Sequence, residues 1–282
     1  MTNIKQYIKF HLRILLDLYK ELIIKFDKQY FAILFNFKSL ILQSPSRILW
    51  NGSSFIVKDK ELPTFSYKIR HQRQCNMAYE FGIKKRVNNL EYEYFLDQIE
   101  FNDGDTFLDC GANVGDLKLW FELQGININY IAFEPSPTEY SCLKENIYPS
   151  IAHNIGLWNQ EGELTFYISS QGADSSLIEP LEFDYEISVQ VSRLCEFITK
   201  PIKCLKLEAE GAEPEILEGI GNKLNMIEFI SADLGYERGK DCLSTLTPVT
   251  NFLLSNNFEL IDVNHGRICA LYRNKSPKLF LS

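Results

Sequence analysis

The sequence predicts an α/β protein whose core is a doubly wound, mostly parallel sheet. Strand-like and helix-like segments alternate from Asp105 onward, and a glycine-containing turn follows the first of these strands. A closing pair of strands, predicted over residues 258–263 and 268–272 across a short turn, would extend the sheet with an antiparallel hairpin. The chain has 282 residues, 45% hydrophobic and 23% charged, which is ordinary for a globular protein.

The segment from Asp105 to Pro137 predicts the first strand–helix–strand unit. Residues 106–108 and 130–133 form short apolar runs typical of buried strands, and residues 116–123 have the broad apolar face of a helix. Gly111 and Gly115 follow the first strand, where the backbone turns tightly and can approach a ligand. Glu134 ends the second strand, 19 residues after Gly115, about where Rossmann-like units keep the carboxylate that accepts ribose hydroxyls. The unit therefore predicts a nucleoside-binding site.

The remaining elements are predicted from the same periodicities. Further strands are expected over residues 151–155, 163–168, 187–191, 204–208 and 226–230, and extended segments over 55–57 and 65–69. Helices are expected over residues 77–99, 138–147, 194–198, 215–219 and 250–255. Residues 159–162 predict a hairpin turn between 156–158 and 163–168.

Residues 1 to about 43 predict one or two amphipathic helices, because apolar residues recur at three- and four-residue steps. Residues 1–48 carry eight Lys and Arg against three Asp and Glu, about +5, which leaves −13 for the rest of the chain. The longest uncharged run within residues 1 to about 43 is residues 29–37, which is too short to span a bilayer. Two interpretations stay open: the arm packs on its own domain or a homodimer partner, or it lies on an anionic membrane.

Charge and cysteine content restrict the function classes. We expect a helical arm and linker over residues 1–60, a main domain over 61–273 and a tail over 274–282. The acidic main body argues against a nucleic-acid partner, since phosphate contacts need basic residues. Seven scattered cysteines without a C-x-x-C spacing, and no visible signal peptide, favour a cytoplasmic protein, with the inner face of the membrane as a peripheral location. No cluster has metal-ligand spacing, so no metal is expected.

The turn after the first strand favours one kind of cofactor. It lacks the third glycine of a dinucleotide-binding loop, and Asp109 stands immediately before it. A carboxylate there suits an ammonium group better than a pyrophosphate. S-adenosylmethionine has an ammonium, a ribose and a sulfonium but no phosphate, so Asp109 is expected at its ammonium and Glu134 at its ribose. The strand ends are expected to line one cleft.

The predicted cofactor site consists of the residues at and just beyond those strand ends. They are Asp109, Gly111, Asn113, Gly115, Glu134, Pro135, Ser136, Asn154, Gly156 and Glu208.

Four segments resemble the FkbM-type S-adenosylmethionine-dependent methyltransferases. They are residues 108–115 (LDCGANVG), 132–137 (AFEPSP), 143–147 and 206–213 (KLEAEGAE), and the likeness covers roughly residues 92–273. The resemblance implies a class I methyltransferase fold, Rossmann-like with a seven-stranded sheet. It also implies O-methylation of sugars or other hydroxyl-bearing natural products, as in polysaccharide biosynthesis. Two positions depart from the family pattern. The family usually has Asp at the position of Glu208, and it often has Asp at the position of Cys195.

Methyl transfer to an alcohol requires positioning and removal of one proton. Glu210, Asp233 and Glu208 are the candidate catalytic bases, because crowded carboxylates raise one another's pKa. Two alternatives remain open: Glu213 caps the next helix instead of binding substrate, and the loop 235–239 is only a connection. His153 is expected to be structural. The predicted acceptor-binding residues are Tyr236, Glu237, Arg238 and Glu213.

Two hypotheses follow for the function. The first is an O-methyltransferase that acts on a hydroxyl of a sugar, a glycan precursor or a related small molecule. The alternative is a non-catalytic cofactor-binding or scaffolding protein at a membrane-associated glycan-assembly site. An RNA methyltransferase is disfavoured by the acidic body.

Overall fold

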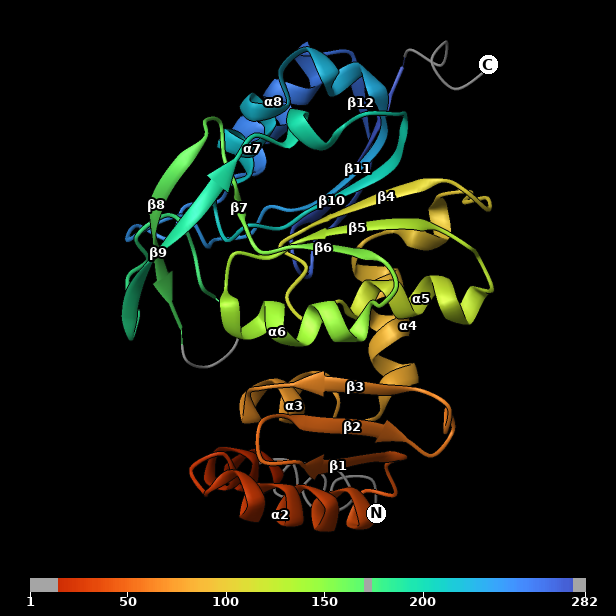
Figure 1. Ribbon diagram of the computed structural model, residues 1–282, viewed down its shortest axis with the longest axis vertical. Helices are drawn as coiled ribbons and strands as arrows, with labels where there is room; N and C mark the ends of the chain where they lie inside the picture. The colour runs from red at the N-terminus through yellow and green to blue at the C-terminus, as the bar shows by residue number, and fades with distance from the viewer. Residues whose placement is uncertain (1–14, 170–173, 276–282) are drawn as a thin grey trace, which may run out of the picture. The chain divides into compact units, whose positions relative to one another are not determined.

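The computed structural model describes residues 15–169 and 174–275 (Figure 1). The chain divides into two compact units, one ending at Arg86 and one beginning at Val87. Helix α4 (Ile83–Glu93) contains the boundary. The units are treated separately below.

The first unit is a helix packed on a three-stranded antiparallel sheet. It contains a helical segment at residues 15–23, α2 (Lys28–Ile41), β1 (Ser46–Trp50), β2 (Phe55–Asp59), β3 (Ser66–Ile69) and α3 (Gln72–Ala78). The Asp27 side chain caps α2 by accepting the Gln29 N–H at 2.9 Å. The ring centroids of Phe31 and Phe55 lie 5.4 Å apart and join helix to sheet. Helices predicted in the arm are confirmed between residues 15 and 41, and residues 1–14 lie outside the described range.

Two predictions for this region need correction. The domain boundary expected after residue 60 would separate β2 from β3, although Phe55 pairs with Ile69, and the compact unit extends to Arg86. The single helix expected over residues 77–99 is broken, because α3 ends at Ala78 and α4 begins only at Ile83. Gly82 lies in the break with φ +93°, a left-handed conformation that interrupts a helix. A Cβ there would also lie 2.4 Å from the Asp59 carboxylate.

The second unit is built on a seven-stranded sheet in the order β12–β13–β11–β10–β4–β5–β6. Strand β13 runs antiparallel to both of its neighbours, and the remaining pairings are parallel. Numbered along the chain, the strands lie in the order 6-7-5-4-1-2-3, which confirms the predicted class I methyltransferase topology. The strands are β4 (Thr106–Cys110), β5 (Asn129–Phe133), β6 (Ile151–His153), β10 (Ile202–Leu207), β11 (Ile227–Asp233), β12 (Phe258–Asn264) and β13 (Cys269–Asn274).

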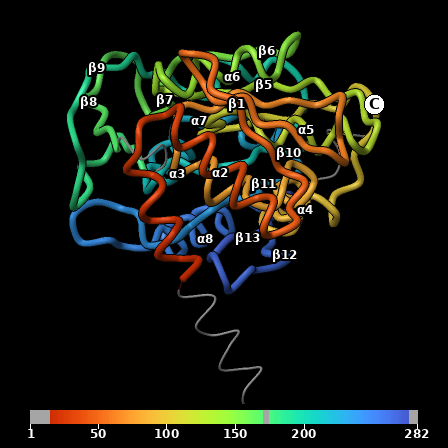
Figure 2. The backbone as a smooth tube through the Cα atoms, turned by 90° about the horizontal axis from the view of Figure 1, so that it is seen from below, coloured from red at the N-terminus to blue at the C-terminus, as the bar shows by residue number. Residues whose placement is uncertain are grey.

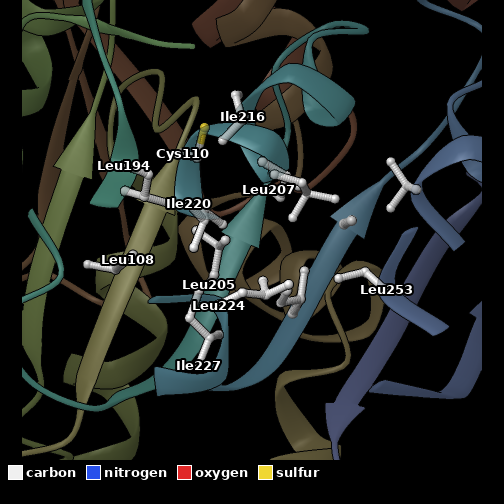
Figure 3. Packing of buried hydrophobic residues seen from close by; sticks show 14 of the residues in the cluster. Leu108, Cys110, Leu194, Leu205, Leu207, Ile216, Ile220, Leu224, Ile227 and Leu253 are labelled. Carbon is white, nitrogen blue, oxygen red and sulfur yellow. The ribbon is translucent and has the colours of Figure 1, made fainter. Parts of the chain in front are cut away.

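Helices cover both faces of this sheet (Figure 1). On one side Phe121 of α5 packs against Phe107 of β4, with ring centroids 5.0 Å apart. On the other side, Leu108 of β4 and Leu205 of β10 belong to the same hydrophobic cluster as Ile216 and Ile220 of α7 (Figure 3). The helical elements are α5 (Asp116–Gln124), α6 (Pro137–Asn146), η2 (Leu194–Phe197), α7 (Glu213–Ile220), η3 (Gly221–Met226) and α8 (Leu246–Ser255).

A second, smaller sheet in this unit was not predicted. It contains β7 (Gly156–Leu157), β8 (Gly162–Ile168) and β9 (Tyr185–Ser192), and β8 and β9 lie side by side in both overall views (Figures 1 and 2). The expected hairpin between β7 and β8 is wrong, because β9 lies between them. Gly156 allows the pairing, since a Cβ there would lie 3.1 Å from Val191 Cγ1 and 3.0 Å from Leu177 Cδ1.

Candidate active site

Lys206 is a buried cation at the carboxyl end of the sheet. The parallel register of β4 and β10 places it beside Asp109, and its Nζ lies 3.1 Å from Asp109 Oδ1 and 2.9 Å from Glu208 Oε2. It also donates to the carbonyl of Gly111 at 2.7 Å. Burial alone would lower the pKa of Lys206, but Asp109 and Glu208 raise it above its usual value. The side chain therefore stays charged.

Asp109 is committed to this internal network. Its side chain is 1% exposed, pairs with Lys206 and accepts the Tyr130 hydroxyl. The arrangement gives Asp109 the role of neutralising a buried lysine. It does not support the predicted contact with an ammonium group of a ligand.

The glycines of the turn after β4 are explained by contacts within the chain. Gly111 has φ +69°, and a Cβ on it would lie 1.8 Å from the carbonyl oxygen of Glu208. Gly115 has φ +87°, and its Cβ would lie 2.5 Å from Ile147. Both positions require glycine, as expected, but the close approach seen here is to the protein's own backbone and to the residue that ends α6.

Glu134 organises the other half of the predicted cofactor site. Its two carboxylate oxygens accept the N–H groups of Asn113 and Ser136, each at 2.8 Å. Asn154 donates to the carbonyls of Glu134 at 2.8 Å and Pro135 at 3.0 Å, so five predicted residues gather here. Each carboxylate oxygen retains a lone pair, which fits the two hydroxyls of a ribose.

The environment of Glu134 opposes its charge. The side chain is 6% exposed, and burial followed by repulsion from Glu139 raises its pKa to about 8. The two backbone donors act in the opposite direction. A ligand that donates further hydrogen bonds would favour the ionised form.

Arg267 ties together three acidic side chains from different elements. It lies in the turn between β12 and β13 and donates to Glu208 Oε1 and Asp233 Oδ2, both at 2.5 Å. Its third contact is Glu93 of α4, at 3.4 Å. Tyr94 adds a hydrogen bond of 2.7 Å to Glu208 Oε2.

Two predicted catalytic acids are therefore held in ion pairs. Burial would raise the pKa of Glu208, but Lys206 and Arg267 outweigh it and bring the value to about 2. A carboxylate this weakly basic is a poor proton acceptor near neutral pH. Asp233 is fully buried, and burial and Glu208 raise its pKa while its pairing with Arg267 opposes the rise.

Glu210 remains a candidate proton acceptor, and Glu237 joins it. Burial raises the pKa of Glu210 well above its ordinary value, and Glu237 and Glu208 add to the effect. The pKa of Glu237 is raised to about 8 by burial, Asp233 and Glu208. Glu210 occupies a left-handed backbone conformation, φ +51°, in the tight turn that follows β10. Strained backbone and crowded carboxyls coincide at this turn.

Three predicted acceptor-binding residues have different environments. Glu213 is fully buried and accepts the backbone N–H groups of Ala209 and Gly211 at 2.8 and 3.2 Å, so it stabilises the turn before α7. Arg238 forms two hydrogen bonds to Glu215, at 2.6 and 2.8 Å, and links the loop after β11 to α7. Neither geometry supports a substrate contact. Tyr236 is 67% exposed.

Two other predicted positions lie outside these clusters. Gly156 belongs to β7 of the small sheet, where its neighbours are Leu177 and Val191. His153 stacks on Phe133 with ring centroids 5.2 Å apart, in agreement with a structural histidine. Within the described ranges no group of three or more His, Cys, Asp or Glu side chains is arranged to hold a metal ion.

Lys206, Arg267 and Tyr94 belong to the site but were not predicted as site residues. Lys206 carried a usable signal, because a lysine flanked by leucines in a parallel core strand must find a buried partner. Arg267 carried none, since a turn arginine is ordinarily solvated. Its role depends on where the hairpin lies in the sheet.

Comparisons with known proteins agree with the fold and with the motifs. The model of the methyltransferase FkbM domain matches residues 109–259, more than half of the chain. "Methyltransferase 1" of Beauveria bassiana is 25% identical over 190 residues, 55% of this chain and 76% of the relative. The hexuronic acid methyltransferase AglP of Haloferax volcanii is 26% identical over 159 residues, which are 53% of this chain and 65% of the relative.

A third relative is the 31-O-demethyl-FK506 methyltransferase FkbM of Streptomyces tacrolimicus, 23% identical over 168 residues, 45% of this chain and 64% of the relative. This chain thus spans just under two thirds of the length of two of these relatives. The family match begins at Asp109 and includes the turn of Gly111, the carboxylate Glu134 that was predicted to bind ribose, and the turn of Glu210. The chain belongs to the FkbM family of S-adenosylmethionine-dependent methyltransferases.

Proposed function

We propose that the chain is an O-methyltransferase that transfers the methyl group of S-adenosylmethionine to a hydroxyl of a sugar, a glycan precursor or a related natural product. The observation that carries the proposal is the pair Glu210 and Glu237 beside the strand ends, two carboxyls whose pKa values are raised, that of Glu237 to about 8. Acceptors of this kind have hydroxyls that must lose a proton on methylation.

The names of two relatives support an oxygen-rich acceptor. One is described as a hexuronic acid methyltransferase and another as a methyltransferase of an O-demethylated natural product. The acidic turns after β10 and β11 are also suited to polyhydroxylated molecules, because carboxylates accept hydrogen bonds from hydroxyl groups.

The donor fits the cluster around Glu134. That carboxylate has two oxygens, each already fixed by a backbone N–H, and its remaining lone pairs would accept the two ribose hydroxyls. The turn between Gly111 and Gly115 would face the same nucleoside. When bound, S-adenosylmethionine supplies a methyl group activated by its sulfonium.

Glu210 is the proposed base. As the acceptor oxygen forms its bond to the methyl carbon, the carbon–sulfur bond breaks and sulfur keeps the electron pair. The hydroxyl proton passes to the Glu210 carboxylate. Glu237 raises the pKa of Glu210 by repulsion and so strengthens it as a base. Glu208, held ionised by Lys206 and Arg267, fixes the negative field around both.

The test is an assay with labelled donor and a panel of uronic acids, nucleotide sugars and oligosaccharides, together with Glu210→Gln and Glu237→Gln. We expect Glu210→Gln to lower kcat by about 10²- to 10⁴-fold without changing donor affinity. Glu237→Gln should shift the acid limb of the pH–rate profile to lower pH, because the repulsion that raises the Glu210 pKa is removed. Full turnover of Glu210→Gln would exclude it as the base, and absence of donor binding by calorimetry would overturn the proposal.

A further inference from the structure

Helix α2 has an unusual distribution of side chains. Its inner face packs in the first unit and includes Phe31, Phe35 and the buried Lys38, which is 2% exposed. Lys38 lies 3.1 Å from Glu80 and is hydrogen-bonded to Asn76. The one charged side chain in the last turn of this helix therefore points inward.

The outer face of α2 is apolar. Five large side chains on it are 57–64% exposed: Tyr30, Ile33, Phe37, Leu40 and Ile41. At 3.6 residues per turn, Ile33, Phe37 and Leu40 lie roughly opposite the inner face, and Tyr30 and Ile41 lie on one flank of the helix. A helix that buries a lysine and exposes five large apolar residues departs from the pattern expected for a helix that faces water. We call these five side chains the outer face.

The preceding helical segment also exposes large apolar side chains. Leu15, Leu18 and Leu22 are 62%, 61% and 54% exposed and recur at steps of three and four, and Phe26 in the connection is 45% exposed. An exposed surface this rich in large apolar residues marks an interaction site. No helix in the described ranges has the length and apolarity needed to cross a bilayer.

The distribution of charge along the chain indicates what kind of surface binds the outer face. Residues 1–86 carry 16 Lys and Arg against 6 Asp and Glu, a net +10, and the rest of the chain carries 13 against 31, a net −18. The change of sign coincides with the division between the compact units. Lys25, before α2, and Lys28, its first residue, are exposed, and the Lys28 ammonium lies 4.8 Å from the centroid of the Trp50 ring. Apolar and aromatic side chains flanked by lysines are the features of an interfacial helix on anionic lipid.

We propose that the outer face of α2, with Leu15, Leu18, Leu22 and Phe26, docks the enzyme on the surface of an anionic membrane. The apolar side chains enter the boundary between headgroups and acyl chains, and the basic first unit is attracted to the lipid charge. The strongly acidic second unit is repelled by the same charge, which favours attachment through the first unit alone.

Flotation of the full chain with vesicles tests this. Vesicles of phosphatidylcholine alone are compared with vesicles that contain phosphatidylglycerol, at low and high salt. We expect binding to the anionic vesicles that weakens with salt, and a loss of about tenfold or more in the Ile33→Gln/Phe37→Gln variant. The Leu254→Gln/Leu260→Gln variant, which changes two exposed apolar residues of the second unit, should bind as the unaltered chain does.

Circular dichroism and donor binding by calorimetry show that each variant is folded. Failure of the unaltered chain to bind anionic vesicles overturns the proposal, as does equal binding by the Ile33→Gln/Phe37→Gln variant. A dimer in light scattering that this variant converts to a monomer, without vesicle binding, would assign the outer face to a second copy of the chain. Donor binding does not depend on any of these outcomes, so the proposed activity stands or falls separately.

Discussion

Lys206 shows how a single buried charge can determine the layout of a site. Its ammonium group balances Asp109 from the neighbouring strand and Glu208 from the end of its own strand. It also binds two carbonyls of the glycine turn, those of Cys110 and Gly111. One side chain thus fixes both the turn after β4 and the acid that begins the carboxylate cluster.

Replacing Lys206 by methionine keeps its length and removes its charge. Because Asp109 is buried and Glu208 largely so, we expect the free energy of unfolding to fall by about 3–5 kcal/mol in denaturant titrations. The added substitution Asp109→Asn removes one of the stranded charges and should recover part of the loss. A Lys206→Met chain as stable as the parent would show that the pair contributes nothing net.

Glu134 predicts a pH-dependent affinity for the donor. Its pKa in the free protein is about 8, and hydroxyl donors stabilise the ionised form, so the bound pKa is lower. Binding below pH 8 must then release a proton, and affinity should rise with pH until about 8 and level off above it. Calorimetry at pH 7 in two buffers of different ionisation enthalpy measures the released proton.

A matched variant, Glu139→Gln, should change the pKa of Glu134 in the opposite direction, downward. Glu139 raises the Glu134 pKa by repulsion, so Glu139→Gln should tighten donor binding at pH 7 and reduce proton release. Donor binding in the parent that takes up a proton, or is independent of pH between 6 and 9, would contradict the assignment of Glu134 to the ribose.

At the scale of elements, the turn between β4 and α5 depends on one close approach. Gly111 and Gly125 have nearly the same backbone conformation, φ +69° and +71°, but only Gly111 lies against another backbone. A Cβ at Gly125 meets nothing within 4 Å, whereas at Gly111 it would lie 1.8 Å from the Glu208 carbonyl oxygen. Alanine substitutions at these two glycines therefore separate the cost of a left-handed backbone from the cost of a steric clash.

Gly125→Ala should cost about 1 kcal/mol of unfolding free energy, the strain of a left-handed alanine. Gly111→Ala should cost several times more and should also abolish donor binding, because the turn and the start of the Glu208–Glu213 segment must move apart. Thermal unfolding and donor calorimetry measure the two effects. Equal losses in both variants would show that the close approach is relieved at little cost.

The elements that carry the fold could be predicted because their signals are local. The strand at 106–110 and the helix at 116–124 follow from apolar runs and periods within a few residues. The pairing of β7 with β9 could not be predicted, because it joins residues 35 positions apart (Gly156 and Val191) with no turn signal between them.

The candidate site could be predicted only in part. The cluster of Asn113, Glu134 and Asn154 follows from strand ends that share one edge of the sheet. The partners of Asp109, Glu208 and Asp233 do not, since Lys206 and Arg267 reach them only through the strand register and the position of the final hairpin. Acids expected to face a ligand are neutralised inside the protein instead.

At the scale of the whole molecule, charge is divided between the two compact units, +10 and −18. In the acidic second unit many of the negative groups crowd at the strand ends. Burial raises the pKa of Glu134 and Glu237 to about 8 and that of Glu210 well above its ordinary value, while Glu208 is lowered to about 2. Stability must therefore depend on pH with opposite signs in two ranges.

The raised groups stay protonated in the folded chain at a pH where they ionise in the unfolded chain. Their stabilisation is complete below the unfolded pKa of about 4.5 and is lost as pH rises toward about 8. Glu208 has the opposite sign, and its contribution is lost as pH falls from about 4.5 toward 2. The melting temperature should thus be highest in mildly acid buffer and fall by several degrees between pH 5 and 8.5.

Glu237→Gln should flatten this fall, because a neutral amide has no proton to lose. The gain should be absent at pH 5 and reach several degrees at pH 8.5, in scanning calorimetry of the full chain. Exposed Glu161→Gln, which also removes one formal charge, serves as the control and should leave the slope unchanged. If both variants shift the curve equally, net charge governs the pH dependence; if only Glu237→Gln does, the stability of the chain is limited by the buried carboxyls of the proposed site.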